Sequence, residues 1–293
     1  MLKQAKAGVL DVGYQDSGPA NGKPLILLHG FPYDVHAYDE VTPLLVSKGC
    51  RVLTPWLRGY GPTRFLSYTT QRSGQQSALG HDLIAFMDAL QISRAVLAGY
   101  DWGGRAACIV AALWPERAQG LVSGGGYNIQ DIRASSEPLP PEFEHALWYQ
   151  YYFHSERGQA SLHRYRLELC RLLWRLWSPG WRFDEATYER TAASFDNPDF
   201  AAVVIHSYRH RFALVAGDPA LEETEERLSA LPAITVPTVV VHGSDDGVLP
   251  SCVSEPHDQY FSGPYKRRII PRAGHNLPQE APQAFAAAVI SLL

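Results

Sequence analysis

The segment RAVLAGYDWGGRAACIVAALW, residues 94–114, decides how the fold of this chain is interpreted. It begins with an apolar run that predicts a buried strand and ends with an alanine-rich run that predicts a helix. Between them, GYDWG at residues 99–103 places Asp101 between glycines, which a tight strand-to-helix turn requires because larger side chains would collide with the backbone. We therefore expect the Asp101 carboxylate at the edge of a sheet, as a reactive group. The alternative is that Asp101 only caps a helix beginning near Arg105.

Short apolar runs alternate with helix-period segments over much of the chain, as is typical of a mostly parallel sheet covered by helices. The expected strands are residues 8–16, 24–28, 51–54, 94–99, 120–123, 237–242 and 266–270, and the expected helices are 82–90, 106–114 and 281–293.

Between residues 127 and 228 this alternation stops, and the stretch is richer in Trp, Tyr and Arg. Apolar residues three and four positions apart predict one buried helix face here, made of Leu162, Tyr165, Leu169, Leu172, Leu173 and Leu176. We expect an α/β core formed by residues 1–126 and 229–293, with residues 127–228 inserted as a helical cap.

Composition limits the kind of protein and its surroundings. The chain of 293 residues is 46% hydrophobic with a net charge of −4, which fits a globular protein with no field to attract nucleic acid. Its four cysteines, Cys50, Cys108, Cys170 and Cys252, form no CxxC pair and fit a reducing compartment. No apolar run is long enough for a signal peptide or a membrane span, so we expect a cytoplasmic protein without a membrane partner. The oligomeric state stays open.

Several short motifs share the order and spacing of a known family. They are HGFP at residues 29–32, RGYG at 58–61, GYDWGG at 99–104, GSDD at 243–246 and GHNLPQE at 274–280. With these motifs the chain resembles the α/β-hydrolase family, in the branch of epoxide hydrolases and haloalkane or haloacid dehalogenases. The resemblance covers nearly the whole chain and implies the α/β-hydrolase fold. Tyr100 departs from it, since epoxide hydrolases usually carry His before the nucleophile.

The resemblance implies roles for individual residues. Asp101 is expected to be the nucleophile, His275 the base, and Asp246 the acid that orients His275, in the chain order of this fold. Asp245 is the reserve candidate for the acid, because turn registers are easily misjudged from sequence.

Two backbone N–H groups, those of Phe31 and Trp102, should form the oxyanion hole. A carboxylate nucleophile that attacked a carbonyl would form an anhydride, whereas attack on a saturated carbon forms an ester that water can cleave. Asp101 therefore favours a small apolar substrate with an electrophilic sp³ carbon, and water, Asp and His suffice without a metal or cofactor.

Epoxide opening releases an alkoxide, which a tyrosine hydroxyl can protonate. Epoxide hydrolases use two cap tyrosines for this step, and WYQYYF at residues 148–153 and SYR at 207–209 resemble the segments that carry them. We assign Tyr149 and Tyr208 as the ring-opening acids, with Tyr152 as the alternative for the first.

The aromatic residues suggest an apolar pocket, in which Trp102, Trp148 and Tyr152 are the expected substrate contacts. A dehalogenase remains the alternative, because Trp102 matches the halide-binding Trp of haloalkane dehalogenases. Fluoroacetate dehalogenases carry two arginines after the nucleophile, of which only the second, Arg105, is present here. A third possibility is a hydrolase-fold protein that binds a small molecule without turning it over, although the expected nucleophile, base and acid are all present.

Overall fold

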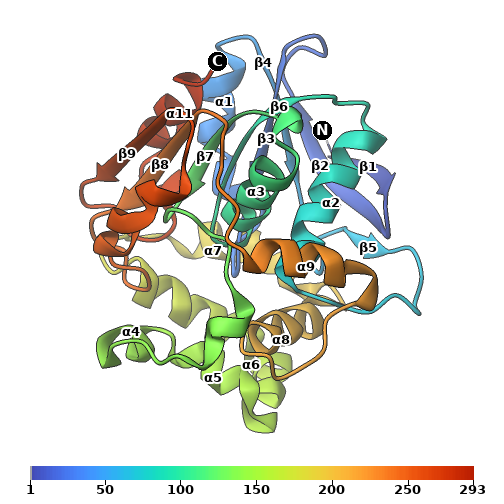
Figure 1. Ribbon diagram of the computed structural model, residues 1–293, viewed down its shortest axis with the longest axis vertical. Helices are drawn as coiled ribbons and strands as arrows, with labels where there is room; N and C mark the ends of the chain where they lie inside the picture. Colours follow the sequence, from blue (N-terminus) through green and yellow to red (C-terminus); the bar gives the residue numbers. More distant parts are fainter. Residues whose placement is uncertain (1) are drawn as a thin grey trace.

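A nine-stranded sheet forms the centre of the molecule in the computed structural model, which describes residues 2–293 (Figure 1). The strands run in the order β1-β2-β4-β3-β6-β7-β8-β9, and β5 pairs with β2. Pairings of β2 with β1, β4 and β5 are antiparallel, and all others are parallel. Their bounds are Leu2–Ala7, Leu10–Ser17, Lys23–Leu28, Cys50–Pro55, Arg64–Phe65, Ala95–Tyr100, Ala118–Gly124, Thr238–Gly243 and Tyr265–Ile270 for β1 to β9.

The strands predicted from apolar runs are confirmed, with shifts of one or two residues at most ends. The start of the chain differs from the prediction. The sequence LKQAKA of β1 is mostly exposed and has no apolar run, so this strand was not predicted. Gly8, with φ of 57°, lies in the turn between β1 and β2, so the expected strand 8–16 began in this turn. An exposed strand at the edge of a sheet lacks the run of apolar residues that burial in the core requires.

Two helix pairs flank the sheet (Figure 1). Helix α2 packs on α3, and α1 packs on α11. The core helices are α1 Val41–Val46, α2 Gln76–Ala89, α3 Asp101–Leu113, α10 Leu277–Glu280 and α11 Pro282–Ile290, with 3₁₀ turns η1 Val35–Tyr38, η2 Pro115–Arg117 and η6 Ser251–Tyr260.

A block of helices lies below the sheet in Figure 1, between β7 and β8 in the chain. It consists of η3 Ile132–Ser136, α4 Pro141–Ala146, α5 Trp148–His154, α6 Glu156–Trp177, α7 Glu185–Ala192, η4 Ala193–Asp196, α8 Phe200–His210, η5 Pro219–Leu221 and α9 Glu222–Ser229. Residues 127–228 contain no named strand, as the sequence predicted. Helix α9 contacts the core helix α2, where Ser77 N–H donates to Glu225 Oε1 over 3.0 Å. The exact division between core and cap stays a prediction.

The buried face of α6 differs from the prediction. Leu162, Leu169 and Leu173 are buried as expected, but Tyr165, Leu172 and Leu176 are 47%, 43% and 46% exposed. The backbone leaves helical geometry at Tyr165, where φ is −123°, and the buried face then continues through Cys170, Trp174 and Trp177. Steps of three and four fit two adjacent faces of a helix, so spacing alone combined residues of the buried face with residues of the exposed face beside it. Within residues 2–293, no helix combines the length and apolarity needed to cross a bilayer.

Trp174 connects α6 to the core. Its side chain is fully buried, and its Nε1–H donates to the Pro32 carbonyl oxygen over 2.8 Å. The indole stacks on Tyr33 and Trp181, with ring centroids 5.1 and 5.3 Å away. Helix α6 is thereby attached to the loop after β3, which also contributes to the candidate site.

We expect Trp174→Ala to lower the free energy of unfolding by about 3–5 kcal/mol, because it leaves a cavity and an unpaired carbonyl oxygen. Leu172→Ala, on the exposed face of the same helix, should change it by less than about 0.5 kcal/mol. Urea unfolding of both variants measures the difference. Equal effects would contradict the burial pattern of α6.

Candidate active site

Asp101 lies at the junction of β6 and α3, where the sequence predicted a tight turn. It is the first residue of α3, so the alternative of a helix beginning near Arg105 is wrong. Its φ of 50° lies in the left-handed region, which costs energy for a residue with a side chain. Position 103 must be glycine, since a Cβ there would lie 2.1 Å from the Leu28 carbonyl oxygen. The turn holds the Asp101 carboxylate directly at the carboxyl end of the sheet.

Two backbone N–H groups donate to one oxygen of Asp101. Phe31 N–H lies 2.8 Å from Asp101 Oδ1, and Trp102 N–H lies 2.7 Å from the same atom. The loop approaches closely because position 30 is glycine, where a Cβ would lie 2.4 Å from Asp101 Cβ. The geometry predicted for the oxyanion hole is present around this oxygen.

His275 and Asp246 meet on the other side of Asp101. His275 Nδ1 lies 2.8 Å from Asp246 Oδ2, and its Nε2 lies 3.7 Å from Asp101 Oδ2. Asp246 Oδ1 accepts hydrogen bonds from the N–H groups of Val248 and Leu249, both at 2.9 Å, which fixes the carboxylate. The reserve candidate Asp245 is exposed and accepts a hydrogen bond from Ser244 instead. The structure therefore brings together Asp101, Asp246 and His275.

Burial and charge together set the protonation of this triad. Burial alone would lower the pKa of His275, but the carboxylates of Asp246 and Asp101 raise it to about 10. For Asp101, burial raises the pKa, but His275, Arg211 and the Phe31 N–H outweigh it and hold the pKa below the usual value. At neutral pH the resting site thus holds a charged carboxylate beside a charged imidazolium.

A second carboxylate, Glu280, holds the loop that carries His275. It accepts hydrogen bonds from Gly274 N–H over 2.7 Å, Asn276 N–H over 3.0 Å and Ser178 Oγ over 2.5 Å. Tyr100 donates to Asn276 Oδ1 over 2.9 Å, which gives this departure from the family pattern a structural role. Sequence reasoning missed these supports, although GHNLPQE contains Glu280.

The two expected cap acids lie together above Phe31. Tyr149, in α5, and Tyr208, in α8, are both buried, and their ring centroids are 5.2 Å apart. Their rings pack on Phe31 at 6.3 and 5.4 Å. Burial, and then neighbouring groups that include Asp101, raise the pKa of each hydroxyl above the usual value, so both stay protonated. Tyr149 Oη accepts from Gln150 over 3.1 Å, whereas Tyr208 Oη has no partner within residues 2–293.

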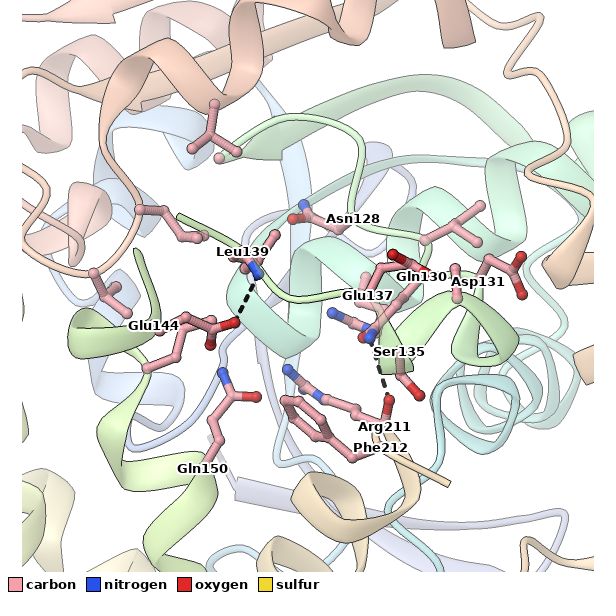
Figure 2. Close-up of a pocket in the computed structure, with 18 of the residues that line it drawn as sticks. Asn128, Gln130, Asp131, Ser135, Glu137, Leu139, Glu144, Gln150, Arg211 and Phe212 are labelled. Atoms are coloured by element: carbon pink, nitrogen blue, oxygen red, sulfur yellow. Dashed lines mark hydrogen bonds between the residues drawn. The ribbon is translucent and has the colours of Figure 1, made fainter. Parts of the chain in front are cut away.

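A cavity of about 640 Å³ reaches Asp101, His275 and Tyr149. Its lining is more polar than expected and includes Arg105, Asn128, Gln130, Glu144, Gln150 and Arg211. Figure 2 shows Gln130 and Arg211 on one side of this space and Glu144 and Gln150 on the other.

The expected substrate contacts Trp102, Trp148 and Tyr152 are not among the lining residues. Trp102 is fully buried, and Trp148 and Tyr152 pack on each other with ring centroids 6.0 Å apart. Between the two candidates for the first acid, the cavity favours Tyr149 over Tyr152.

Comparison with known proteins defines the class. The sequence model of the alpha/beta hydrolase fold matches residues 23–282. The chain belongs to the alpha/beta hydrolase fold family.

Its named relatives are epoxide hydrolases and haloalkane dehalogenases. Epoxide hydrolase B of Mycobacterium tuberculosis is 31% identical over 156 residues, which are 49% of this chain and 43% of the relative. A haloalkane dehalogenase of Mycobacterium marinum is 34% identical over 122 residues, 40% of this chain and 39% of the relative. The chain thus matches less than half the length of these curated relatives. A crystal structure of a candidate epoxide hydrolase from Klebsiella pneumoniae is 47% identical, with a TM-score of 0.97 over 99% of this chain and 96% of that one.

The free energy of unfolding should depend on pH through His275. Since its pKa is raised from 6.5 to about 10 on folding, the stabilisation is full below pH 6.5 and is lost as the pH rises through about 10. We expect the wild-type protein to lose more stability than His275→Gln between these two pH values, as measured by urea unfolding. An equal loss in both proteins would contradict the charged imidazolium.

Proposed function

We propose that this protein is an epoxide hydrolase that forms a covalent alkyl ester on Asp101. The observation that carries the proposal is the asymmetry of the Asp101 carboxylate. Oδ1 accepts two backbone N–H groups, whereas Oδ2 has no such donor and lies 3.7 Å from His275 Nε2. Oδ2 is therefore the oxygen that attacks, and Oδ1 becomes the carbonyl oxygen of the ester.

In the first step Asp101 Oδ2 attacks one epoxide carbon and the C–O bond of the ring breaks. The departing oxygen takes a proton from Tyr149 or Tyr208, whose raised pKa values keep both hydroxyls protonated until then. Asp101 needs no activation for this step, because its lowered pKa keeps it ionised.

In the second step His275 takes a proton from water, which attacks Asp101 Cγ. Formation of the ester removes the Asp101 charge, one of the groups that hold the pKa of His275 near 10, so the imidazolium releases its proton, which restores the tyrosine, and the neutral imidazole becomes a base. The Phe31 and Trp102 N–H groups then stabilise the oxyanion on Oδ1, a contribution of about 3–4 kcal/mol per donor in other enzymes. Collapse of the tetrahedral intermediate gives the diol, whose oxygen takes the proton from His275, and the proton of the new Asp101 carboxyl returns to the imidazole, which restores the resting site.

A dehalogenase is the second candidate. Trp102 Nε1 is buried without a hydrogen-bond partner within residues 2–293, and such a donor suits a halide ion. Named relatives of the chain include haloalkane dehalogenases. The tyrosine pair, which halide release does not need, favours the epoxide. Incubation with styrene oxide and with bromoalkanes, with diol and bromide assayed, separates the two candidates.

The two-step scheme predicts a trapped intermediate. His275→Gln should form the ester but hydrolyse it about 10²–10⁴-fold more slowly, because the general base is absent. Intact-mass spectrometry after incubation with styrene oxide should show the mass of one substrate added to the protein. Asp101→Asn is the matched control and should show no adduct.

A single turnover in ¹⁸O-labelled water gives an independent check. The label should enter the carboxylate of residue 101, because water attacks Cγ, and proteolysis followed by mass spectrometry locates it. Label found only in the diol would overturn the ester scheme.

Removal of both tyrosine hydroxyls tests the ring-opening acids. Tyr149→Phe with Tyr208→Phe should lower kcat for styrene oxide about 10²–10⁴-fold, because no proton reaches the departing alkoxide. Tyr152→Phe is the matched control on the same cap helix and should keep wild-type kcat. Full epoxide activity in the double variant would show that the cap acids are wrongly assigned.

A further inference from the structure

Two arginines share the candidate cavity with the nucleophile. Arg105 lies on α3 one turn after Asp101, and Arg211 follows the last residue of α8 in the cap. Both line the same space as Asp101 and His275. Both are also close enough to Asp101 for mutual electrostatic effects on their pKa values.

Neither guanidinium has a carboxylate partner. Within residues 2–293, no ion pair involves Arg105 or Arg211. Arg105 Nη1 reaches only the amide oxygens of Gln76 and Gln130, at 3.4 and 3.3 Å. The Arg211 guanidinium lies over the Tyr208 ring, 4.7 Å from its centroid.

Of the three other acidic residues in the lining, Glu137 is exposed, and the remaining two have partners outside the arginine pair. Asp131 Oδ1 accepts from Arg133, and Glu144 accepts from Leu139 N–H and Tyr151 Oη. Burial, and then the charge of Arg211, lower the pKa of Arg105 to about 9, although the charges of Asp101 and Glu225 act in the opposite direction. Adjacent unpaired cations in a partly closed site cost free energy that an anionic ligand would recover.

We infer that the substrate carries a carboxylate group, which Arg105 and Arg211 bind while Asp101 attacks the epoxide carbon. This inference rests on the proposed function and narrows the substrate to epoxy acids. The planar fork of a guanidinium donates two parallel hydrogen bonds to a carboxylate, so two arginines can hold both oxygens. They also offset the repulsion between the substrate carboxylate and Asp101, which would otherwise oppose binding of an acid.

A neutral substrate would leave the two arginines with only structural roles. The matched pair of 3-phenyloxirane-2-carboxylate and 3-phenyloxirane-2-carboxamide separates these cases, because the two epoxides differ mainly in charge. We expect the wild-type protein to turn over the carboxylate with a kcat/KM at least about tenfold higher, mainly through KM. Equal values for the two compounds would overturn the inference.

Variants of the two arginines test whether these residues cause the preference for the carboxylate. Arg211→Gln should lower the ratio of kcat/KM for the carboxylate to kcat/KM for the carboxamide about tenfold or more, because the ratio cancels any effect of Arg211 on Asp101 or Tyr208, while Arg211→Lys should lie between it and the wild type. Arg133→Gln removes an arginine that is 70% exposed and should keep the full preference. A carboxylate preference that survives in Arg211→Gln and in Arg105→Gln would overturn the assignment to these residues.

Calorimetry with an unreactive acid separates this inference from the reaction itself. The wild-type protein should bind 3-phenylpropanoate more tightly than 3-phenylpropanamide, and Arg211→Gln should lose the difference. If this binding is found but no epoxide is opened, the anion site stands and the proposed function fails. If styrene oxide is opened but neither acid is preferred, the proposed function stands and the inference fails.

Discussion

Two backbone N–H groups, from Phe31 and Trp102, converge on Asp101 Oδ1, and the rest of the site depends on this contact. The two loops meet because β3 and β6 are adjacent parallel strands with Leu28 opposite Gly99. Parallel strands end at the same edge of a sheet, so residues far apart in sequence arrive at one point. Because the donors are main-chain groups, held by the loop after β3 and by the first turn of α3, they need little reorganisation as charge develops on the oxygen.

The acid and the base reach the site by the same route. Strands β8 and β9 are parallel neighbours with Gly243 opposite Ile270, and the loops that follow them carry Asp246 and His275. Hydrogen bonds from Val248 and Leu249 orient Asp246, and Glu280 orients the backbone around His275. One edge of one sheet therefore positions every group of the triad, while the cap supplies the tyrosines.

The sequence predicted those parts of the molecule whose pattern is imposed locally. Buried strands are apolar runs, and the turn at Asp101 requires glycine at position 103, so both are visible in the sequence. The exposed strand β1 and the buried face of α6 were not predicted correctly, because edge pairing and packing of the cap decide them. The sequence also did not predict that Arg105 and Arg211 line one cavity. Arg105 lies on the core helix α3 and Arg211 follows the cap helix α8, so no local sequence pattern connects them.

Charge balance links the two arginines to the proposed chemistry. Within the group formed by the triad and the two arginines, two carboxylates at rest face three cations, which leaves one positive charge in excess in this group. When the ester forms, Asp101 loses its charge and His275 loses its proton, so the excess is unchanged. A substrate with one negative charge would neutralise the site in both states and would keep its binding energy through the cycle. The arginines would then hold the substrate carboxylate in place with equal strength before and after the ester forms. The hydrogen bonds to Asp101 Oδ1, in contrast, would lower the barrier of the reaction.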